Sequence, residues 1–112
     1  MYQAVLATCR AGDEVIVPAP YWPSYPEIAR LAGATPVVAP SAAAEGYALT
    51  PAALEAALTP RTRLLILCNP SNPSGCVLSP PQLDALAAVL RRHPRVWVLA
   101  DEVRQKGRVT AV

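Results

Sequence analysis

The sequence has few charged residues and no long apolar run, and each shortage excludes a class of protein. Charged residues make up 16% of the chain and apolar residues 53%, a balance that favours a folded core over a disordered chain. No segment approaches the ~20 consecutive apolar residues that cross a bilayer, so we do not expect a membrane protein. The net charge is only +2, and the one basic cluster, at 91–95, stands at a predicted helix end, so we do not expect a nucleic-acid partner either.

Cysteines are also scarce. The three of them, Cys9, Cys68 and Cys76, are an odd number without the spacing of metal ligands, so no metal site is predicted. Cys68 lies within an apolar run, which favours buried thiols in a reducing compartment such as the cytoplasm. Residues 1–10 lack the basic region that opens a signal peptide, and no targeting segment is expected.

A length of 112 residues allows one domain at most, or part of one. A free-standing domain this short buries only roughly 60–70% of its unfolded surface, so a chain this apolar is expected to be covered by further protein. Residues 2–9 predict the last turns of a helix that stops at Gly12, with nothing before them. We therefore expect a fragment.

Apolar runs alternate with helical patterns. Strands are predicted at 14–17, 36–39, 63–68 and 96–100. Further helices are predicted at 27–32, at 51–58 behind the N-cap Thr50, and at 80–92 behind the N-cap Ser79, where Gln82 completes a capping box. This alternation predicts βαβ units and a parallel sheet, hence the α/β fold class.

The strand at 63–68 has no polar alternation and is predicted to be buried on both faces. It ends in a polar loop, NPSNPSG at 69–75, and such loops bind ligands in open α/β sheets. Trp22, Asn72 and Asp101 each follow the carboxyl end of a predicted strand, so the topology brings them to one rim. An aromatic plane, an amide and a carboxylate suit a flat ligand with a protonated ring nitrogen.

Three segments carry a resemblance to a known family: GDEVIVPAPYWPSYP at 12–26, NPSNPSG at 69–75 and VLADE at 98–102. In this order they closely resemble the class I/II aminotransferases of the aspartate aminotransferase family, nearest the aspartate/prephenate aminotransferase branch. The resemblance covers residues 1–103 and implies part of the mostly parallel-sheet large domain of a fold-type I transferase that uses pyridoxal 5'-phosphate. Residues 104–112 are predicted to be a divergent tail.

The resemblance implies a role for each rim residue. Trp22 would stack on the pyridine ring and contact the substrate, Asn72 would bind the ring oxygen and the substrate carboxylate, and Asp101 would pair with the pyridine nitrogen. The implied reaction moves an amino group between an aspartate- or glutamate-type amino acid and a 2-oxo acid, for which prephenate is one candidate. The family also implies a homodimer, cis peptide bonds before Pro20 and Pro73, and a plastid location in a plant or alga.

The chain lacks the lysine that forms the Schiff base in this family. Its only lysine, Lys106, follows Asp101 by five residues, whereas the family's catalytic lysine lies several dozen residues further on. Arg104 also stands where the family usually has a tyrosine. We therefore assign no catalytic residue and expect this chain alone to be inactive.

Other interpretations remain open at this point. Trp22 could be a core aromatic, Asn72 a turn residue and Asp101 a helix cap. The proline-rich, aromatic segment 18–26 could instead dock in the groove of an SH3 or WW domain, which would require it to be extended and exposed. A non-catalytic fragment that is stable only within a larger chain is a third possibility.

Overall fold

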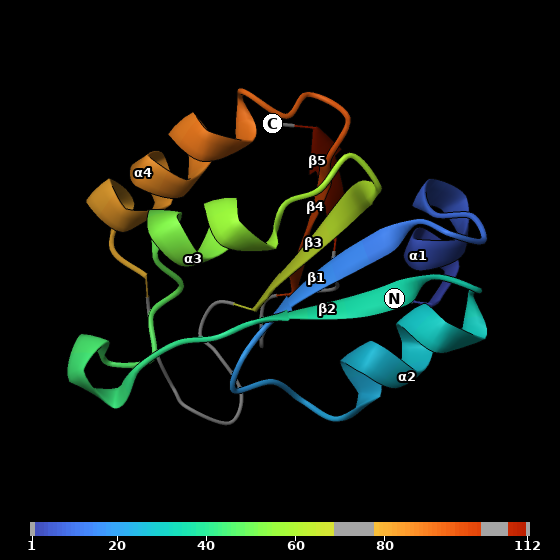
Figure 1. Ribbon diagram of the computed structural model, residues 1–112, viewed down its shortest axis with the longest axis horizontal. Helices are drawn as coiled ribbons and strands as arrows, with labels where there is room; N and C mark the ends of the chain where they lie inside the picture. The colour runs from blue at the N-terminus through green and yellow to red at the C-terminus, as the bar shows by residue number, and fades with distance from the viewer. Residues whose placement is uncertain (1, 69–77, 102–107, 112) are drawn as a thin grey trace.

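The computed structural model describes residues 2–68, 78–101 and 108–111 (Figure 1). Helices and strands alternate along most of the chain, as predicted. In order they are α1 (Tyr2–Thr8), β1 (Glu14–Pro18), α2 (Ser24–Leu31), β2 (Thr35–Ala39), a short 3-10 helix (Ala43–Glu45), α3 (Pro51–Ala57), β3 (Thr62–Cys68), α4 (Pro80–Leu90), β4 (Trp97–Asp101) and β5 (Arg108–Ala111).

The strands form one sheet in the order β2-β1-β3-β4-β5. The first four are parallel, which confirms the α/β prediction, and β5 pairs with β4 in the antiparallel sense. The strand β5 was not predicted, because four residues without clear periodicity carry too weak a local signal. Its partner β4 supplies the backbone groups that it pairs with, and that pairing is visible only in the tertiary structure.

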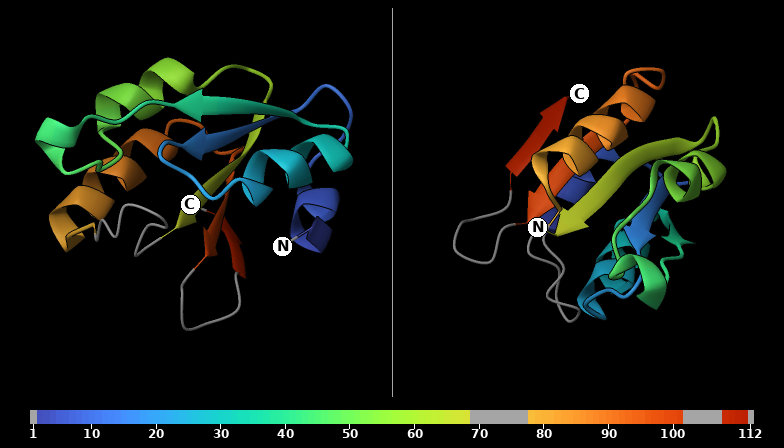
Figure 2. Two further views of the ribbon diagram at one scale, coloured as in Figure 1. Left: turned by 90° about the horizontal axis from the view of Figure 1, so that it is seen from below. Right: turned by 90° about the vertical axis from the view of Figure 1, so that its left-hand side faces the viewer.

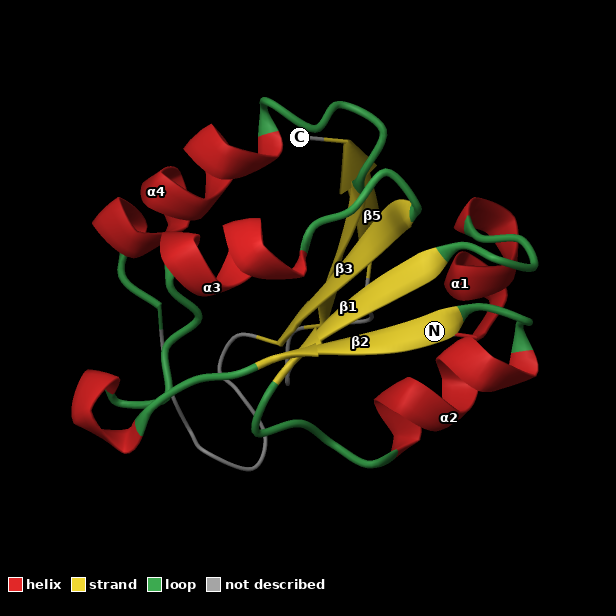
Figure 3. Cartoon of the chain, in the orientation of Figure 1, coloured by secondary structure: helices red, strands yellow, loops and turns green. Residues whose placement is uncertain are grey.

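The helices cover both faces of the sheet (Figure 3): α1 and α2 lie on one side, and α3 and α4 on the other. The strand β3 contributes to both layers, as its apolar sequence predicts. Leu64 and Ile66 belong to the core cluster on the α1–α2 side, while Leu65 belongs to the cluster on the α3–α4 side. All three are at most 1% exposed, so the strand is buried on both faces. Figure 2 shows the two layers from other directions.

A glycine ends the second helix, as predicted: Gly33 follows the C-cap of α2 with φ +84°, the left-handed region in which glycine meets no Cβ penalty. The predicted stop at Gly12 is not the end of α1, because the helix already ends at Thr8. Gly12, with φ +89°, lies instead in the turn closed by the Asp13 N–H on the Arg10 carbonyl at 3.0 Å. The helix α2 begins at Ser24, three residues before the predicted start. Pro26 does not prevent this, because it lies in the first turn, where backbone N–H groups have no partner within the helix.

The helix α4 carries the predicted capping box. The Gln82 backbone N–H donates to Ser79 Oγ at 3.3 Å, and the Ser79 backbone N–H donates to Gln82 Oε1 at 2.7 Å. The Thr50 side chain caps α3 in the same way, accepting from the Ala53 N–H at 3.1 Å, with Pro51 at the first helical position. Both helices therefore begin where the sequence placed them.

Replacing Ser79 with alanine is expected to lower the free energy of unfolding by about 0.5–2 kcal/mol, because it removes the acceptor for an N–H of the first turn. Urea denaturation followed by far-UV circular dichroism measures this loss. The matched variant Ser79→Asp keeps an acceptor and should remain close to the wild type. Equal losses in the two variants would contradict the capping role.

Trp97 is an exception among the apolar residues of β4. An aromatic residue in an apolar strand is expected to be a core residue, yet Trp97 is 38% exposed, while Val98 and Leu99 are buried. It is the first residue of its strand, and its side chain stays partly exposed although the paired Leu64 is fully buried.

None of the helices in the part of the chain that the structure describes is long and apolar enough to span a membrane.

Candidate functional site

The strand order reverses next to β1. From β1 the chain crosses to β2 on one side, and after β2 it returns to β3 on the other side of β1. The first crossover contains α2 and the second contains α3, which lie on opposite faces of the sheet. In open α/β sheets a ligand site lies outside the carboxyl ends of the strands at such a reversal. The topology therefore points to the ends of β1 and β3.

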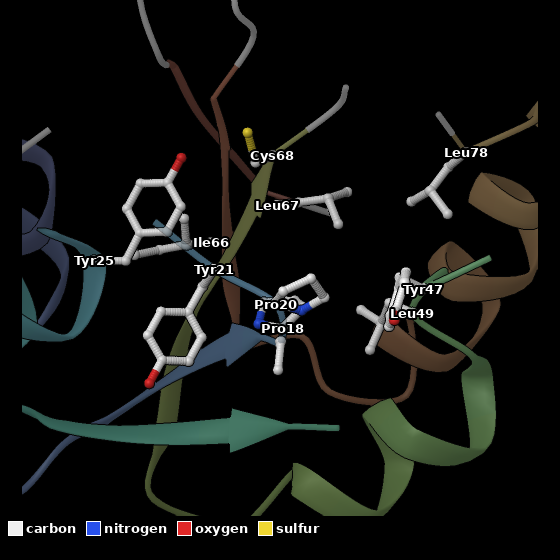
Figure 4. Close-up of a pocket in the computed structure, with 11 residues that line it drawn as sticks. Pro18, Pro20, Tyr21, Tyr25, Tyr47, Leu49, Ile66, Leu67, Cys68 and Leu78 are labelled. Carbon is white, nitrogen blue, oxygen red and sulfur yellow. The ribbon is translucent and has the colours of Figure 1, made fainter. Parts of the chain in front are cut away.

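A pocket lies at that point. Figure 4 shows Tyr21 and Tyr25 on one side of it and Tyr47, Leu49 and Leu78 on the other, with the ends of β1 and β3 between them. Its walls are mainly apolar and aromatic, the usual composition of a small-molecule site. The residues that line it are Pro18, Ala19, Pro20, Tyr21, Tyr25, Tyr47, Leu49, Ile66, Leu67, Cys68 and Leu78.

The turn after β1 is tied to the end of β2. The Ala19 backbone N–H donates to the Ala39 carbonyl at 2.8 Å, and the Ser41 hydroxyl donates to the Ala19 carbonyl. The Ala19–Pro20 peptide bond is cis, as the resemblance implied, while the bond before Pro73 lies outside the described residues. These contacts define the path of the chain from the sheet into Tyr21 and Trp22.

Trp22 stands beside the pocket. Its carbonyl accepts a hydrogen bond from the Tyr25 N–H at 3.0 Å, and its indole meets the Tyr25 ring edge-on, with centroids 5.8 Å apart and planes at 88°. Tyr25 is 3% exposed and lines the pocket, whereas Trp22 is 47% exposed. Trp22 is therefore half-buried at the rim, as predicted, and is not a core aromatic.

The same segment does not have the geometry of a proline-rich ligand. A peptide for an SH3 or WW groove would be extended and exposed over 18–26. Here Ser24 begins a helix, and Tyr25 and Pro26 are buried against the core. The structure thus contradicts the condition on which that alternative depended.

Asp101 is the last residue of β4. It pairs with Cys68, the last residue of β3, and Cys68 lines the pocket. The backbone of Asp101 is thereby brought to the same rim as the ends of β1 and β3. Asn72 lies outside the described residues, so its predicted place on this rim stays a prediction, as do the functional roles of all three residues.

Sequence reasoning missed the wall formed by Tyr47, Leu49 and Leu78. Gly46 and Tyr47 both have left-handed backbones, with φ +65° and +60°, which is unusual for a tyrosine. The Gly46 N–H bonds to the Ala43 carbonyl and the Tyr47 N–H to the Ala42 carbonyl, each at 3.0 Å. This pair of bonds is a Schellman motif, and a glycine followed by an apolar residue after a short helical turn was its sequence signal.

The thiols of the described residues form no disulfide. Cys9 is 4% exposed, and burial raises the pKa of its thiol above the ordinary value, which disfavours the thiolate. Cys68 lies at the pocket, while Cys76 is outside the described residues. Cys9 therefore packs in the core cluster on the α1–α2 side of the sheet.

The chain is similar to aminotransferases over nearly its whole length. The family model for aminotransferase class I and II matches residues 2–110. A bifunctional aspartate aminotransferase and glutamate/aspartate-prephenate aminotransferase of Petunia hybrida is 55% identical over 101 residues, which are 90% of this chain and 21% of the relative. An aspartate/prephenate aminotransferase of Cereibacter sphaeroides is 50% identical over 103 residues, 92% of this chain and 26% of the relative.

Solved structures have the same fold. The crystal structure of the aspartate aminotransferase from Rhizobium meliloti matches with a TM-score of 0.86 at 47% identity, covering 89% of this chain and 25% of that one. The aspartate aminotransferase of Thermus thermophilus, solved with maleate, also matches at 0.86, with 38% identity over 91% of this chain and 26% of that one. The chain spans 21–26% of the length of these four relatives.

Proposed function

This chain belongs to the class I and II aminotransferases, and we propose that it forms part of the cofactor-binding domain of an aspartate/prephenate-type aminotransferase. The complete enzyme would move an amino group between an aspartate- or glutamate-type amino acid and a 2-oxo acid such as prephenate, and it would act as a homodimer. The observation that carries this proposal is the apolar pocket at the reversal of strand order, bordered by Trp22 and by the end of β4.

The residues near the pocket fit pyridoxal phosphate, which this family generally uses. The indole of Trp22 is half exposed and braced edge-on by Tyr25, so it can offer a face to a flat ring. Asp101 ends the adjacent strand, and its carboxylate would raise the pKa of a pyridine nitrogen and keep that nitrogen protonated. The protonated ring of the bound cofactor is what accepts an electron pair during transamination.

The other roles belong to the loop after β3. Asn72 would donate to the ring oxygen of the cofactor and bind the substrate carboxylate, and Trp22 would contact the same substrate. Lys106, the only lysine, lies outside the described residues and is too close to Asp101 in sequence to match the family's lysine. The chain by itself is therefore proposed to bind the cofactor weakly and without turnover.

Titration with pyridoxal phosphate tests the cofactor site. We expect reversible, saturable quenching of tryptophan fluorescence together with a shift of the cofactor absorbance. Trp22→Phe should weaken binding and remove most of the quenching, because it removes the indole beside the pocket. The matched control is Trp97→Phe, since Trp97 begins β4 at the opposite end of the strand. Quenching that disappears only in the Trp97 variant would overturn the proposed site.

The claim of inactivity has its own test. Borohydride treatment in the presence of cofactor and aspartate, followed by mass spectrometry, should show no lysine adduct that accompanies conversion of the amino acid. Such an adduct, together with turnover by purified chain, would show that Lys106 acts as the family's lysine does and would overturn this part of the proposal.

A further inference from the structure

A second pocket lies at the opposite edge of the sheet. There the loop from α3 to β3 and the turn from α4 to β4 lie side by side, at the amino ends of the two strands (Figure 1). The residues that line this amino-edge pocket are Thr59, Pro60, Thr62, Arg92, His93, Pro94, Arg95 and Val96. It shares no residue with the pocket at the carboxyl ends, so the proposed aminotransferase site does not account for it.

The lining of the amino-edge pocket contains three basic side chains and no carboxylate. Two carboxylates contact its lining residues. Glu14 accepts from Thr59 Oγ1 at 2.6 Å and is paired with Arg61 Nε at 3.3 Å. Glu55 of α3 bonds Arg92 Nη2 at 3.0 Å and lies 3.9 Å from His93 Nε2. Glu55 therefore offsets the charge of Arg92. Arg95 donates from Nη2 to the Pro60 carbonyl at 2.9 Å, a neutral acceptor, so its full positive charge remains. The pocket is consequently cationic.

Both guanidinium groups are held in place yet keep unused donors. A guanidinium carries five N–H groups in a fixed fork that matches the oxygens of a phosphate or carboxylate. One donor of Arg92 is used by Glu55 and one of Arg95 by Pro60. Each bond restrains one guanidinium group at a single N–H and leaves its other N–H donors available, so part of the side-chain entropy cost of binding an anion is already met.

The dipole of α4 does not by itself account for the basic residues that line this pocket. Cations near a helix C-terminus offset the helix dipole, which is an ordinary role for basic residues after a helix. Here the backbone N–H groups of 91–93 already bond the carbonyls of Ala87, Val89 and Leu90. Arg95 lies beyond Pro94 and is attached to the α3–β3 loop instead of to the helix end. Arg95 thus joins the two loops that form the pocket and carries its charge there.

We propose that the amino-edge pocket binds a tetrahedral oxyanion, either free phosphate or a small phosphate monoester. Arg95 supplies the main charge, and Arg92 and His93 of the same α4–β4 segment supply further N–H donors. This site is independent of the aminotransferase proposal, because it lies at the other edge of the sheet and uses none of the same residues.

The chain offers a direct probe of this pocket, because His93 is its only histidine. Its imidazole proton signal in NMR spectra should shift saturably when inorganic phosphate is added at fixed pH, with ionic strength held constant by sodium chloride. A parallel titration with glycerol phosphate separates a free anion from a monoester. Equal responses to phosphate and to chloride alone would overturn the proposal.

Two variants sharpen the test. Arg95→Gln should weaken phosphate binding about tenfold or more, since it removes a charge-assisted hydrogen bond. Arg30→Gln is the matched control, because Arg30 is an exposed arginine of α2 that lies 3.8 Å from Glu27, far from this pocket in the fold. It should bind phosphate as the wild type does. Unchanged affinity in Arg95→Gln, or an equal loss in both variants, would refute an oxyanion site at this pocket.

Discussion

Replacing Leu65 with alanine is expected to lower the free energy of unfolding by about 2–5 kcal/mol, through lost burial and the cavity that remains. Leu65 is fully buried in β3 and packs in the core cluster between the sheet and the α3–α4 layer. Domains are commonly stable by only about 5–15 kcal/mol, so this single change removes a large share of the total. Urea denaturation followed by far-UV circular dichroism measures the loss.

The control for this prediction is Leu31→Ala. Leu31 is the last residue of α2 and is 71% exposed, so its truncation should change the free energy of unfolding by less than about 0.5 kcal/mol. The contrast between the two leucines tests whether β3 is buried as the fold requires. Similar small losses in both variants would mean that β3 is not packed between two helical layers in solution.

Replacing Asp101 with asparagine is expected to weaken pyridoxal phosphate binding by about tenfold or more, since the change removes a charge-assisted hydrogen bond and preserves size. The expectation follows from the place of Asp101 at the end of β4, in register with Cys68 of the pocket wall. Without the carboxylate, the ring nitrogen would also lose the neighbour that keeps it protonated. Absorbance and fluorescence titrations report both effects.

Asp84→Asn serves as the matched control. Asp84 is an exposed residue of α4, so this substitution removes one negative charge away from the pocket. It should leave cofactor affinity unchanged. If the Asp101 and Asp84 variants bound equally well, the carboxyl end of β4 would not be part of the cofactor site, and the pocket between β1 and β3 would need another ligand.

In the proposed site, the pocket and the residues beside it have different roles. The ends of β1 and β3 form an apolar pocket, and in the proposed site Trp22 beside it would supply an aromatic face and Asp101 at the end of β4 would supply a charge. The position matching the family's lysine is not found among these 112 residues. A chain with this half of the site is expected to recognise the cofactor ring without carrying out the proton transfers of transamination.

Much of this fold could be predicted from the sequence, because its signals are local. The apolar run at 63–68 predicted a strand buried on both faces, and Leu64 and Leu65 do belong to opposite core layers. The N-caps Thr50 and Ser79 and the stop at Gly33 predicted helix ends within a residue or two. Each of these rests on contacts between residues a few positions apart, which a sequence displays directly.

The α/β class, the helix caps and the likeness to aminotransferases, which rests on three ordered motifs, follow from the amino-acid sequence. Other features emerge from the folded chain: β5 joins the sheet, Trp97 is partly exposed, and Tyr47 and Leu78 line the pocket. The amino-edge pocket likewise exists because Pro60 and Arg95, 35 residues apart, meet across two loops. Such features depend on packing between distant segments, and local patterns contain no measure of that packing.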